Sequence, residues 1–454
     1  MVRSTMSVTG PQGCLALGNV RQLQRDPLNL FLRIRREHGD IARLRLGPEE
    51  LFVFSHPDHL KYILADNVAN WQKQERFRKA IFPILGNGLL LSEGDFWKRQ
   101  RRIANPVFHR QRIASFADTM VRSGLEMLDG WRARLAKEGE DTVLDVAAEM
   151  KRLTLKIVGR ALFSRELGDE GDKVGPAVDQ ASSYIFLQTN SMFMTPKYVP
   201  TPGMRRFRAA SKLLDGLIYR FIEERRSGKT QGDDLLQMML DARDPETGES
   251  LSDQQLRDEL TTFYLAGHET TSNALSWTFY LLGKHPTVER ELRREIGQVL
   301  GKRFPRMEDL PNLPYTARVI DESMRLYPPA WIFGRTSVGP DEIGGVRIKK
   351  GTNVLWCPWV IHRDPRFFEH PEGFDPDHFL PEKVKTRHLY AYTPFGGGQR
   401  KCIGAGFATM EMQILVPVIL QAFRLQLEPG FQAEPMPAVT LSPKNGVRMR
   451  VEPA

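Results

Sequence analysis

The stretch Phe395-Gly-Gly-Gly-Gln-Arg-Lys-Cys-Ile-Gly404 decides the fold of this chain. It directly precedes a helical run over 405–422, so Cys402 stands at a helix N-terminus beside Arg400 and Lys401. Backbone N–H donors and positive charge at such a place favour a thiolate, the form of cysteine that binds a soft metal. The glycines allow a flat ligand to come close. Taken alone, the stretch is more often typical of a buried structural cysteine in a tight loop.

The composition is that of an ordinary globular protein. The chain has 454 residues, of which 41% are hydrophobic and 26% charged, and these values exclude disordered, collagen-like and fibrous proteins. A length of this size suggests about three domains. The net charge of +9 predicts an acidic partner, which leaves nucleic acid, a membrane surface and an acidic protein open.

The cysteines and apolar runs indicate a cytoplasmic location. Cys14, Cys357 and Cys402 are far apart and form no Cys-x-x-Cys pair, which argues against a disulfide framework or a structural zinc site. Apolar runs such as 414–420 are much shorter than the roughly 20 residues of a membrane-spanning helix, so we expect no transmembrane anchor. Residues 1–18 lack the apolar core of a signal peptide.

Helical periodicity dominates the chain, and a few short segments alternate like strands. We expect hairpins that pair 42–46 with 51–54, 346–348 with 353–355, and 439–441 with 447–451. One long helix should begin at the capping box Ser252-x-x-Gln255 and run to Gly283, about 45 Å, which is enough to cross the core. Its middle, 267–273, consists of poor helix formers, and stability alone does not explain such a run.

The stretch that contains Cys402 resembles the haem-binding signature Phe-x-x-Gly-x-Arg-x-Cys-x-Gly of the cytochrome P-450 superfamily of haem-thiolate monooxygenases. The matching residues are Phe395, Gly398, Arg400, Cys402 and Gly404. The resemblance implies a haem b whose iron is held by the Cys402 thiolate, a ligand that favours O–O cleavage. It also implies that Arg400 meets a haem propionate and that Phe395 packs near the sulfur.

Further residues resemble the propionate partners of this family. Trp97-Lys-Arg-Gln-Arg101 is similar to the family's W-x-x-x-R, so Trp97 and Arg101 would meet a propionate, and Arg335 resembles another partner. The arginine fork carries a permanent charge and suits a carboxylate. Without the resemblance, the first pair would be a helix pair at the edge of the core and Arg335 a surface arginine.

Glu322-Ser-Met-Arg325 resembles the family's E-x-x-R motif. By itself it would be an i,i+3 ion pair worth a few tenths of a kcal/mol. In the family this pair is buried and tied to a segment that corresponds to 374–379 here. That segment has His378 where the family usually has arginine. His378 could still donate to Glu322, but its charge would titrate.

Ala266-Gly-His-Glu-Thr-Thr271 resembles the oxygen-activation motif of the family's long I helix, which accounts for the weak middle of the expected helix. Ala266 and Gly267 would leave space above the iron, and Thr270 would hydrogen-bond to the iron-bound oxygen. Glu269 would help to deliver protons through water. The alternative is a local break caused by threonine and serine side chains. His268 is expected to pack and not to bind iron.

Together the motifs span 97–404 in the order that the family requires, so the chain is identified as a cytochrome P-450 of the soluble bacterial type. This resemblance implies a mainly α fold with small β-sheets, in which haem lies between the long central helix and the cysteine loop with its following helix. We expect a single domain over 1–454, with a β-containing part at about 1–70 and a helical haem-binding core at about 71–454.

The implied reaction is the insertion of one oxygen atom of O₂ into an apolar compound. Hydroxylation or epoxidation of a terpenoid, fatty acid, steroid or macrocycle-like compound of secondary metabolism would fit. Trp331 would narrow the space beside the haem and favour a flat or slender substrate. Any pocket residue could instead be plain core. Alignment with the family gives as pocket residues Phe82, Leu85, Leu89, Phe263, Ala266, Trp331, Ile332 and Phe333, with the segment 184–194 and the turn near Lys444.

Electrons are expected from separate proteins, a ferredoxin or flavodoxin with an NAD(P)H-dependent reductase, because the chain has no Gly-rich nucleotide fingerprint. Residues 98–112 include six Lys or Arg, at positions 98, 99, 101, 102, 110 and 112, and no Asp or Glu. In the family this region lies near the cysteine loop, so an acidic carrier should dock there. The plain alternative is a solvated helix face. We expect a monomer.

The sequence leaves two rival functions open. A peroxide-driven haem-thiolate peroxygenase is disfavoured by the acid-alcohol pair Glu269-Thr270, which such enzymes usually lack. A basic nucleic-acid-binding protein is the distant alternative, and no base-reading motif supports it.

Overall fold

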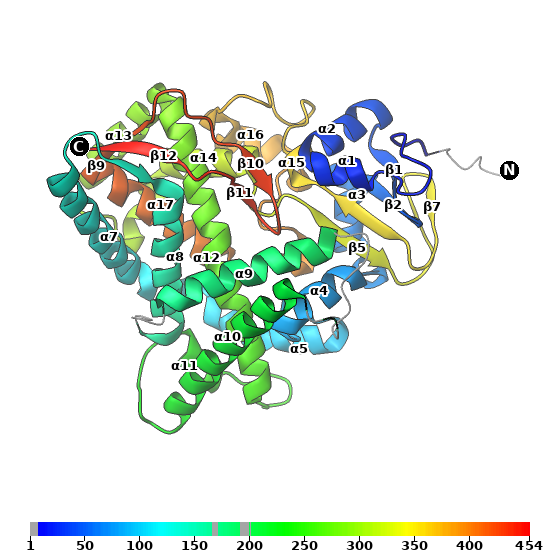
Figure 1. Ribbon diagram of the computed structural model, residues 1–454, viewed down its shortest axis with the longest axis horizontal. Helices are drawn as coiled ribbons and strands as arrows, with labels where there is room; N and C mark the ends of the chain where they lie inside the picture. Colours follow the sequence, from blue (N-terminus) through cyan, green and yellow to red (C-terminus); the bar gives the residue numbers. More distant parts are fainter. Residues whose placement is uncertain (1–7, 166–170, 191–198, 200) are drawn as a thin grey trace.

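The computed structural model describes residues 8–165, 171–190, 199 and 201–454. In these ranges the protein is mainly helical with small sheets, as expected, and α12 runs through the middle of the molecule (Figure 1). The helices are α1 Val20–Arg25, α2 Pro27–His38, α3 Pro57–Lys61, α4 Glu75–Leu85, α5 Gly94–Ala104, α6 Arg110–Ile113, α7 Ala117–Glu138, α8 Val146–Phe163, α9 Gly171–Asn190, α10 Pro202–Arg226, α11 Leu235–Asp241, α12 Asp253–Lys284, α13 Pro286–Leu300, α14 Pro314–Leu326, α15 Pro358–Ile361, α16 Pro381–Thr386 and α17 Ala405–Ala422.

The strands are short, and the largest sheet has the order β1-β2-β8-β5-β3. The smaller sheets among the described residues have the orders β4-β12-β9, β6-β7 and β10-β11. The strands are β1 Ile41–Leu46, β2 Glu49–Phe54, β3 Trp71–Gln72, β4 Val143–Asp145, β5 Phe333–Ser337, β6 Asp341–Ile343, β7 Val346–Ile348, β8 Asn353–Trp356, β9 Phe423–Leu427, β10 Pro435–Pro437, β11 Leu441–Pro443 and β12 Arg448–Pro453.

The central helix begins and ends as its sequence predicts. The Ser252 side chain accepts from the Gln255 backbone and the Gln255 side chain accepts from the Ser252 backbone, so the capping box is complete. α12 then continues for 32 residues and stops before Pro286. Gly267 lets α8 come close, because a Cβ at this position would lie 2.9 Å from Cγ2 of Val158. The weak helix former is therefore also required by packing.

One of the three expected hairpins is present, and two are wrong. β1 and β2 pair as predicted. β7, however, pairs with β6 across Gly344 and Gly345, both at positive φ, which suits a tight two-residue turn. β8 joins β2 and β5 instead.

At the C-terminus, β11 pairs with β10, and β12 pairs with β9 and β4. The turn signals at 350–351 and 445–446 therefore connect strands of different sheets. β7 and β11 each pair with the strand that directly precedes them, whereas β8 and β12 pair with strands from distant parts of the chain, about which the local pattern carries no information.

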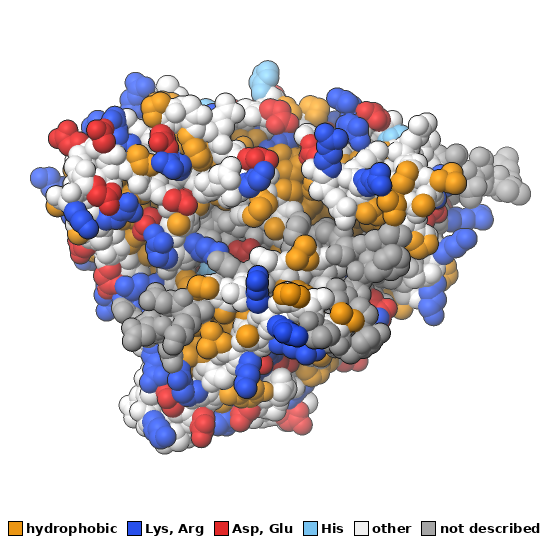
Figure 2. Space-filling model, in the orientation of Figure 1, with side chains coloured by type: hydrophobic (Ala, Val, Ile, Leu, Met, Phe, Trp, Pro, Cys, Tyr) orange, Lys and Arg blue, Asp and Glu red, His pale blue; other side chains and the backbone are white. Residues whose placement is uncertain are grey.

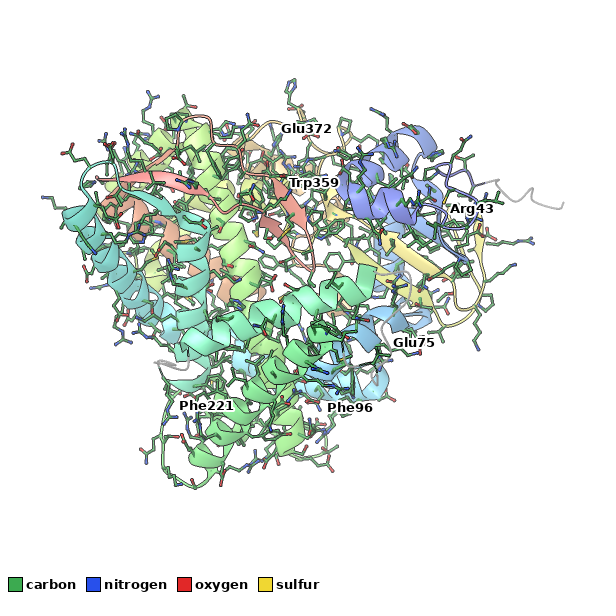
Figure 3. The ribbon with its side chains drawn as sticks, in the orientation of Figure 1. Arg43, Glu75, Phe96, Phe221, Trp359 and Glu372 are labelled. Atoms are coloured by element: carbon green, nitrogen blue, oxygen red, sulfur yellow. The ribbon has the colours of Figure 1, made fainter. Side chains whose placement is uncertain are left out.

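The N-terminal β-containing part is completed by the C-terminal half of the chain. The largest sheet combines strands from 41–72 with strands from 333–356. A buried cluster likewise joins Leu30 and Val53 to Trp359 and Leu441, and Figure 3 labels Trp359 where these parts meet. Because both the sheet and this cluster join the two ends of the chain, we infer a single domain.

Helix α17 is the apolar helix that follows the cysteine loop. Within the described ranges it is the one helix that is long and apolar enough to cross a membrane on those two criteria. Of its residues, 61% are buried inside the protein, and core helices commonly share this composition. It packs against α7 and α12.

Gly398 generates a stability prediction, because the cysteine loop passes very close to residue 64. Its φ is +63°, and a Cβ would lie 1.8 Å from the carbonyl oxygen of Leu64. Gly398→Ala should lower the free energy of unfolding by about 3 kcal/mol, since it adds a steric clash to a strained backbone. Denaturant titration measures this loss.

Gly396→Ala is the matched control. Gly396 also has a positive φ of +71°, but no atom lies within 4 Å of its Cβ position. It should lose only about 1 kcal/mol, the cost of the left-handed backbone. Equal losses at both positions would contradict the proposed close approach.

Candidate functional site

Cys402 faces a cavity of about 330 Å³ at the start of α17. Its backbone N–H donates to the carbonyl of Phe395 at 2.9 Å, which closes the loop. A Cβ on Gly404 would lie 3.9 Å from Sγ of Cys402, so glycine leaves the space beside the sulfur open. Burial raises the pKa of the Cys402 thiol, while the backbone N–H of Gly404 and the charge of Arg101 favour the thiolate. A cation bound at the sulfur would stabilise the thiolate further.

Helix α12 forms another wall of this cavity. Phe263, Ala266, Gly267 and Thr270 all line it, and their small or apolar side chains leave it largely apolar. The Thr270 hydroxyl donates to the carbonyl of Ala266 at 2.8 Å. Its oxygen therefore remains available to accept a hydrogen bond from a group in the cavity.

Four cationic side chains meet at one end of the cavity. They are Lys73, Arg101, Arg335 and Arg400, and all four line it. Burial lowers the pKa of Lys73 well below its ordinary value and that of Arg335 to about 10. Arg400 forms an ion pair with Glu93 and lies 4.0 Å from the centre of the Trp97 ring.

The charges at this end do not balance within the part of the chain that the structure describes. Glu93 is the carboxylate that interacts with Lys73, Arg335 and Arg400, so the cluster keeps an excess of positive charge. Buried cations without partners are costly. A ligand with two carboxylates would relieve this cost, and a haem b carries two propionates. The thiol, the open space beside it and the cations therefore fit a haem.

Lys73 was not expected from the sequence. It follows β3, whose Gln72 lies opposite Thr336 of β5, next to Arg335. This strand pairing brings Lys73 into the cluster, and no local motif marks it. The other cations, Arg101, Arg335 and Arg400, lie where the family resemblance predicts.

The Glu322–Arg325 pair is fully buried on α14. Arg325 donates to both carboxylate oxygens of Glu322, at 2.6 and 2.7 Å, and to the carbonyls of His362, Pro371 and Gly373.

His378 does reach this pair, with Nδ1 3.1 Å from Oε1 of Glu322. Its Nε2 lies 2.6 Å from the carbonyl of Glu369, so both ring nitrogens face acceptors.

Half of the expected pocket residues line the cavity. These are Leu89, Phe263, Ala266 and Phe333. Phe108 also lines it, and its ring packs edge-to-face on Phe263 with centroids 5.0 Å apart. The sequence did not predict Phe108 as a pocket residue, because nothing in the pattern around a lone phenylalanine after a basic helix indicates that it lines a cavity.

The other expected pocket residues lie elsewhere. Trp331 does not narrow the cavity, because its indole N–H donates to the carbonyl of Ala438 at 3.0 Å and its ring packs against Phe31. Ile332 belongs to the same N-terminal cluster. Phe82 is 46% exposed, and Leu85 is buried in the main core.

No described residue of the two expected pocket segments lines the cavity. Lys444 is exposed and paired with Glu434. Tyr184 of the 184–194 segment stacks on Phe207 of α10, and residues 191–194 lie outside the described residues.

Glu269 does not line the cavity, unlike its neighbour Thr270. Its carboxylate accepts hydrogen bonds from Thr440 and Ser182. His268 is fully buried, and its ring stacks on that of Tyr264.

Three of the six cations of the basic stretch 98–112 form ion pairs within the described ranges. Lys98 contacts Asp95, while Arg99 and Arg102 both contact Asp244 in the loop before α12. Glu249 and Glu246 add further ion pairs to these two arginines. On the face shown in Figure 2, cationic and acidic side chains are interspersed. The loop before α12 therefore neutralises Arg99 and Arg102 on α5, whereas Arg110 and Arg112 on α6 remain exposed.

Comparisons with known proteins agree with this geometry. The family model "Cytochrome P450" matches residues 8–449. Cyclooctatin synthase of Streptomyces melanosporofaciens is 37% identical over 98% of this chain and 95% of the relative. Pentalenene oxygenase of Streptomyces avermitilis is 33% identical over 98% of this chain and 96% of the relative. A crystal structure of cytochrome P450DA heme domain matches with a TM-score of 0.90 at 28% identity, covering 100% of this chain and 99% of that one.

The cation cluster predicts that Lys73 destabilises the ligand-free protein. Lys73→Met should raise its free energy of unfolding by about 2 kcal/mol, since it removes a desolvated cation that lies close to Arg335 and Arg400. The folded-state pKa of Lys73 lies below the ordinary value of 10.5, so wild-type stability should rise as pH increases toward 10.5. This rise should be smaller in the variant. Urea titrations of ligand-free protein at several pH values measure both effects.

Lys79→Met is the matched control, because Lys79 is 65% exposed on α4 and pairs with Glu75. It should change the free energy of unfolding by less than about 0.5 kcal/mol. The haem-loaded Lys73→Met protein should, in contrast, release haem to apomyoglobin faster than wild type. A Lys73→Met variant that is less stable when ligand-free, or that retains haem equally well, would contradict the role of the cluster.

Proposed function

The chain belongs to the cytochrome P450 family and is a haem-thiolate monooxygenase, and we propose that it oxidises a cyclic terpenoid with electrons from a separate carrier protein. The observation that carries this proposal is the largely apolar cavity between Cys402 and α12. Family membership also removes the nucleic-acid-binding alternative.

In this proposal each element around the cavity holds one part of the cofactor. When bound, the haem activates dioxygen and transfers one oxygen atom to the substrate. Cys402 holds the iron through its thiolate. The cations Lys73, Arg101, Arg335 and Arg400 pair with the propionates and thereby lose most of their excess charge.

Helix α12 controls the distal side of this site. Ala266 and Gly267 keep space for a small molecule, since neither has a side chain longer than a methyl group. Thr270 Oγ1 keeps its own proton on the Ala266 carbonyl and accepts a hydrogen bond from water or ligand in the cavity. Glu269 supplies protons to this water from the outer side of the helix.

The lining supports a compact apolar substrate. Leu89, Phe108, Leu162, Phe263 and Phe333 line the cavity, together with the threonines Thr262, Thr270 and Thr271 of α12. Relatives named cyclooctatin synthase, cyclooctat-9-en-7-ol 5-monooxygenase and pentalenene oxygenase support a cyclic terpenoid. Two edge-to-face phenylalanines present rigid walls to such a ring system.

Ligand titration of the holoenzyme tests the substrate class. Pentalenene and related cyclic terpenes should convert the iron from low to high spin, because an apolar ring displaces water from the pocket. Palmitate should bind at least about ten-fold more weakly, a difference of about 1.4 kcal/mol. Visible spectroscopy measures both affinities.

Product formation provides the second arm of this test. Oxygenated product should appear with O₂, NADH, ferredoxin and its reductase. Equal product with hydrogen peroxide alone would favour the peroxygenase alternative, and stronger binding of palmitate would contradict the terpenoid assignment.

The carrier protein should dock beside the cysteine loop, on cations that are not already paired within the described ranges. Arg110 and Arg112 on α6 are exposed and have no ion pair there. The next residue, Ile113, packs near Gly406 of α17, with its Cδ1 3.1 Å from the Cβ position of that glycine. These arginines therefore lie close to the helix that Cys402 precedes, where an acidic ferredoxin or flavodoxin is attracted. We infer a cytoplasmic location, where such a carrier and its reductase would work.

Charge reversal tests this docking surface. Arg110→Glu combined with Arg112→Glu should lower the rate of electron transfer from an acidic ferredoxin several-fold at low ionic strength, and the difference should shrink with added salt. Lys350→Glu is the control, since Lys350 is an exposed cation in the turn between β7 and β8. Stopped-flow reduction measures the rates. Equal slowing in both variants would reject α6 as the docking site.

A further inference from the structure

The carboxylate of Glu269 is held at both oxygens by hydroxyl groups from distant parts of the chain. Thr440, in the loop between β10 and β11, donates to Oε1 at 2.6 Å. Ser182 of α9 donates to Oε2 at 3.1 Å. In Figure 1, α9 lies in front of α12. The β10–β11 hairpin, which belongs to the C-terminal part of the chain, is drawn in red. Three separate elements therefore meet at one acid.

The contact with Thr440 has a fixed direction. Asn273, one turn further along α12, donates from Nδ2 to Oγ1 of Thr440 at 3.0 Å. Because this hydroxyl accepts from Asn273, its own proton points to Glu269. Thr440 and Asn273 are each only 7% exposed, so water does not compete strongly for these bonds. Oε1 is thus held in one orientation by a buried chain of two hydrogen bonds.

The contact with Ser182 is different. Ser182 is half-buried, and within the described ranges Glu269 is its hydrogen-bond partner. A hydroxyl with no second fixed partner can turn from donor to acceptor. Ser182 can therefore donate to the carboxylate and can also accept from the protonated acid, and it is less buried than Thr440, so solvent reaches it more easily.

We propose that Thr440 and Ser182 are positioning residues for Glu269, with different tasks. Thr440 fixes Oε1, and Ser182 is the hydroxyl through which Oε2 regains its proton from solvent. In that step Ser182 gives its proton to Oε2 and takes one from a water molecule that in turn receives a proton from bulk solvent, so the hydroxyl and the water are restored and Glu269 is protonated. The proposal rests on the proposed function for the use of that proton, but the hydrogen-bond network does not depend on the substrate.

The network also ties α9 to α12. Loss of either hydroxyl loosens Glu269, and a loosened Glu269 holds α9 less firmly through Ser182. Two groups that act through one carboxylate should therefore show non-additive effects. This property separates a shared network from two independent packing contacts.

Hydrogen exchange of the holoenzyme, followed by mass spectrometry, tests this coupling without any substrate. Ser182→Ala should increase exchange of the backbone amides at 180–186 by about ten-fold, the effect of losing one charge-assisted hydrogen bond. Thr440→Val should increase it in the same segment, and the double variant should not exceed the larger single effect. Ser182→Thr and Thr440→Ser keep the hydroxyls and should exchange like wild type. Additive effects, or wild-type exchange in Ser182→Ala, would overturn the network.

The solvent isotope effect on NADH oxidation, with ferredoxin, reductase and pentalenene as the probe, tests the proton task. Ser182→Ala should increase this isotope effect, and Ser182→Thr should restore it, whereas a purely structural contact would leave it unchanged. An unchanged isotope effect with altered exchange would overturn the relay and leave only a structural tie. If pentalenene proves not to be a substrate, the exchange experiment still decides the network, so failure of the proposed function is distinguishable from failure of this inference.

Discussion

Excess positive charge at a buried site is the constraint on which the rest of this structure depends. Lys73, Arg101, Arg335 and Arg400 come from four different segments and line one cavity, and among the described residues Glu93 is the carboxylate that interacts with Lys73, Arg335 and Arg400. Their mutual repulsion and desolvation destabilise the protein until a dianionic ligand occupies the site. Binding of such a ligand then contributes directly to the stability of the folded state. A haem in this cavity would be contacted by residues of β5, α5 and the cysteine loop together.

Helix α12 is stable although its centre, which lines the cavity, consists of poor helix formers. Thr270, Ser272 and Ser276 each donate to a carbonyl three or four residues earlier, so their hydroxyls are satisfied. Gly267 serves both the cavity and the close packing of α8. The capping box at Ser252 and Gln255 fixes the start of the helix, and its great length gives it many partners. The helix therefore tolerates a weak centre that a shorter helix would not.

Local signals and motif spacing predicted the parts of this protein that are local or strongly constrained by chemistry. The capping box located α12, and the motifs located Cys402, Trp97, Arg101 and Arg400 around one cavity. Strand pairing was not predictable in the same way. The turn signal at Lys350-Gly351 favoured pairing of β7 with β8, but β7 pairs with β6 across the turn at Gly344-Gly345. Lys73 reaches the site only through the pairing of β3 with β5. The ion pairs of Arg99 and Arg102 with Asp244 bridge more than 140 positions, and no local pattern reports such contacts.

The central claim is that Cys402 binds haem iron as a thiolate within this cluster of cations. The visible spectrum of the purified, reduced and CO-treated protein tests it most directly, because thiolate ligation of the haem iron would shift the Soret band strongly to the red. Wild-type protein should show that band, and Cys402→Ala should lose it. A colourless protein, or a red-shifted band that persists in Cys402→Ala, would contradict the account.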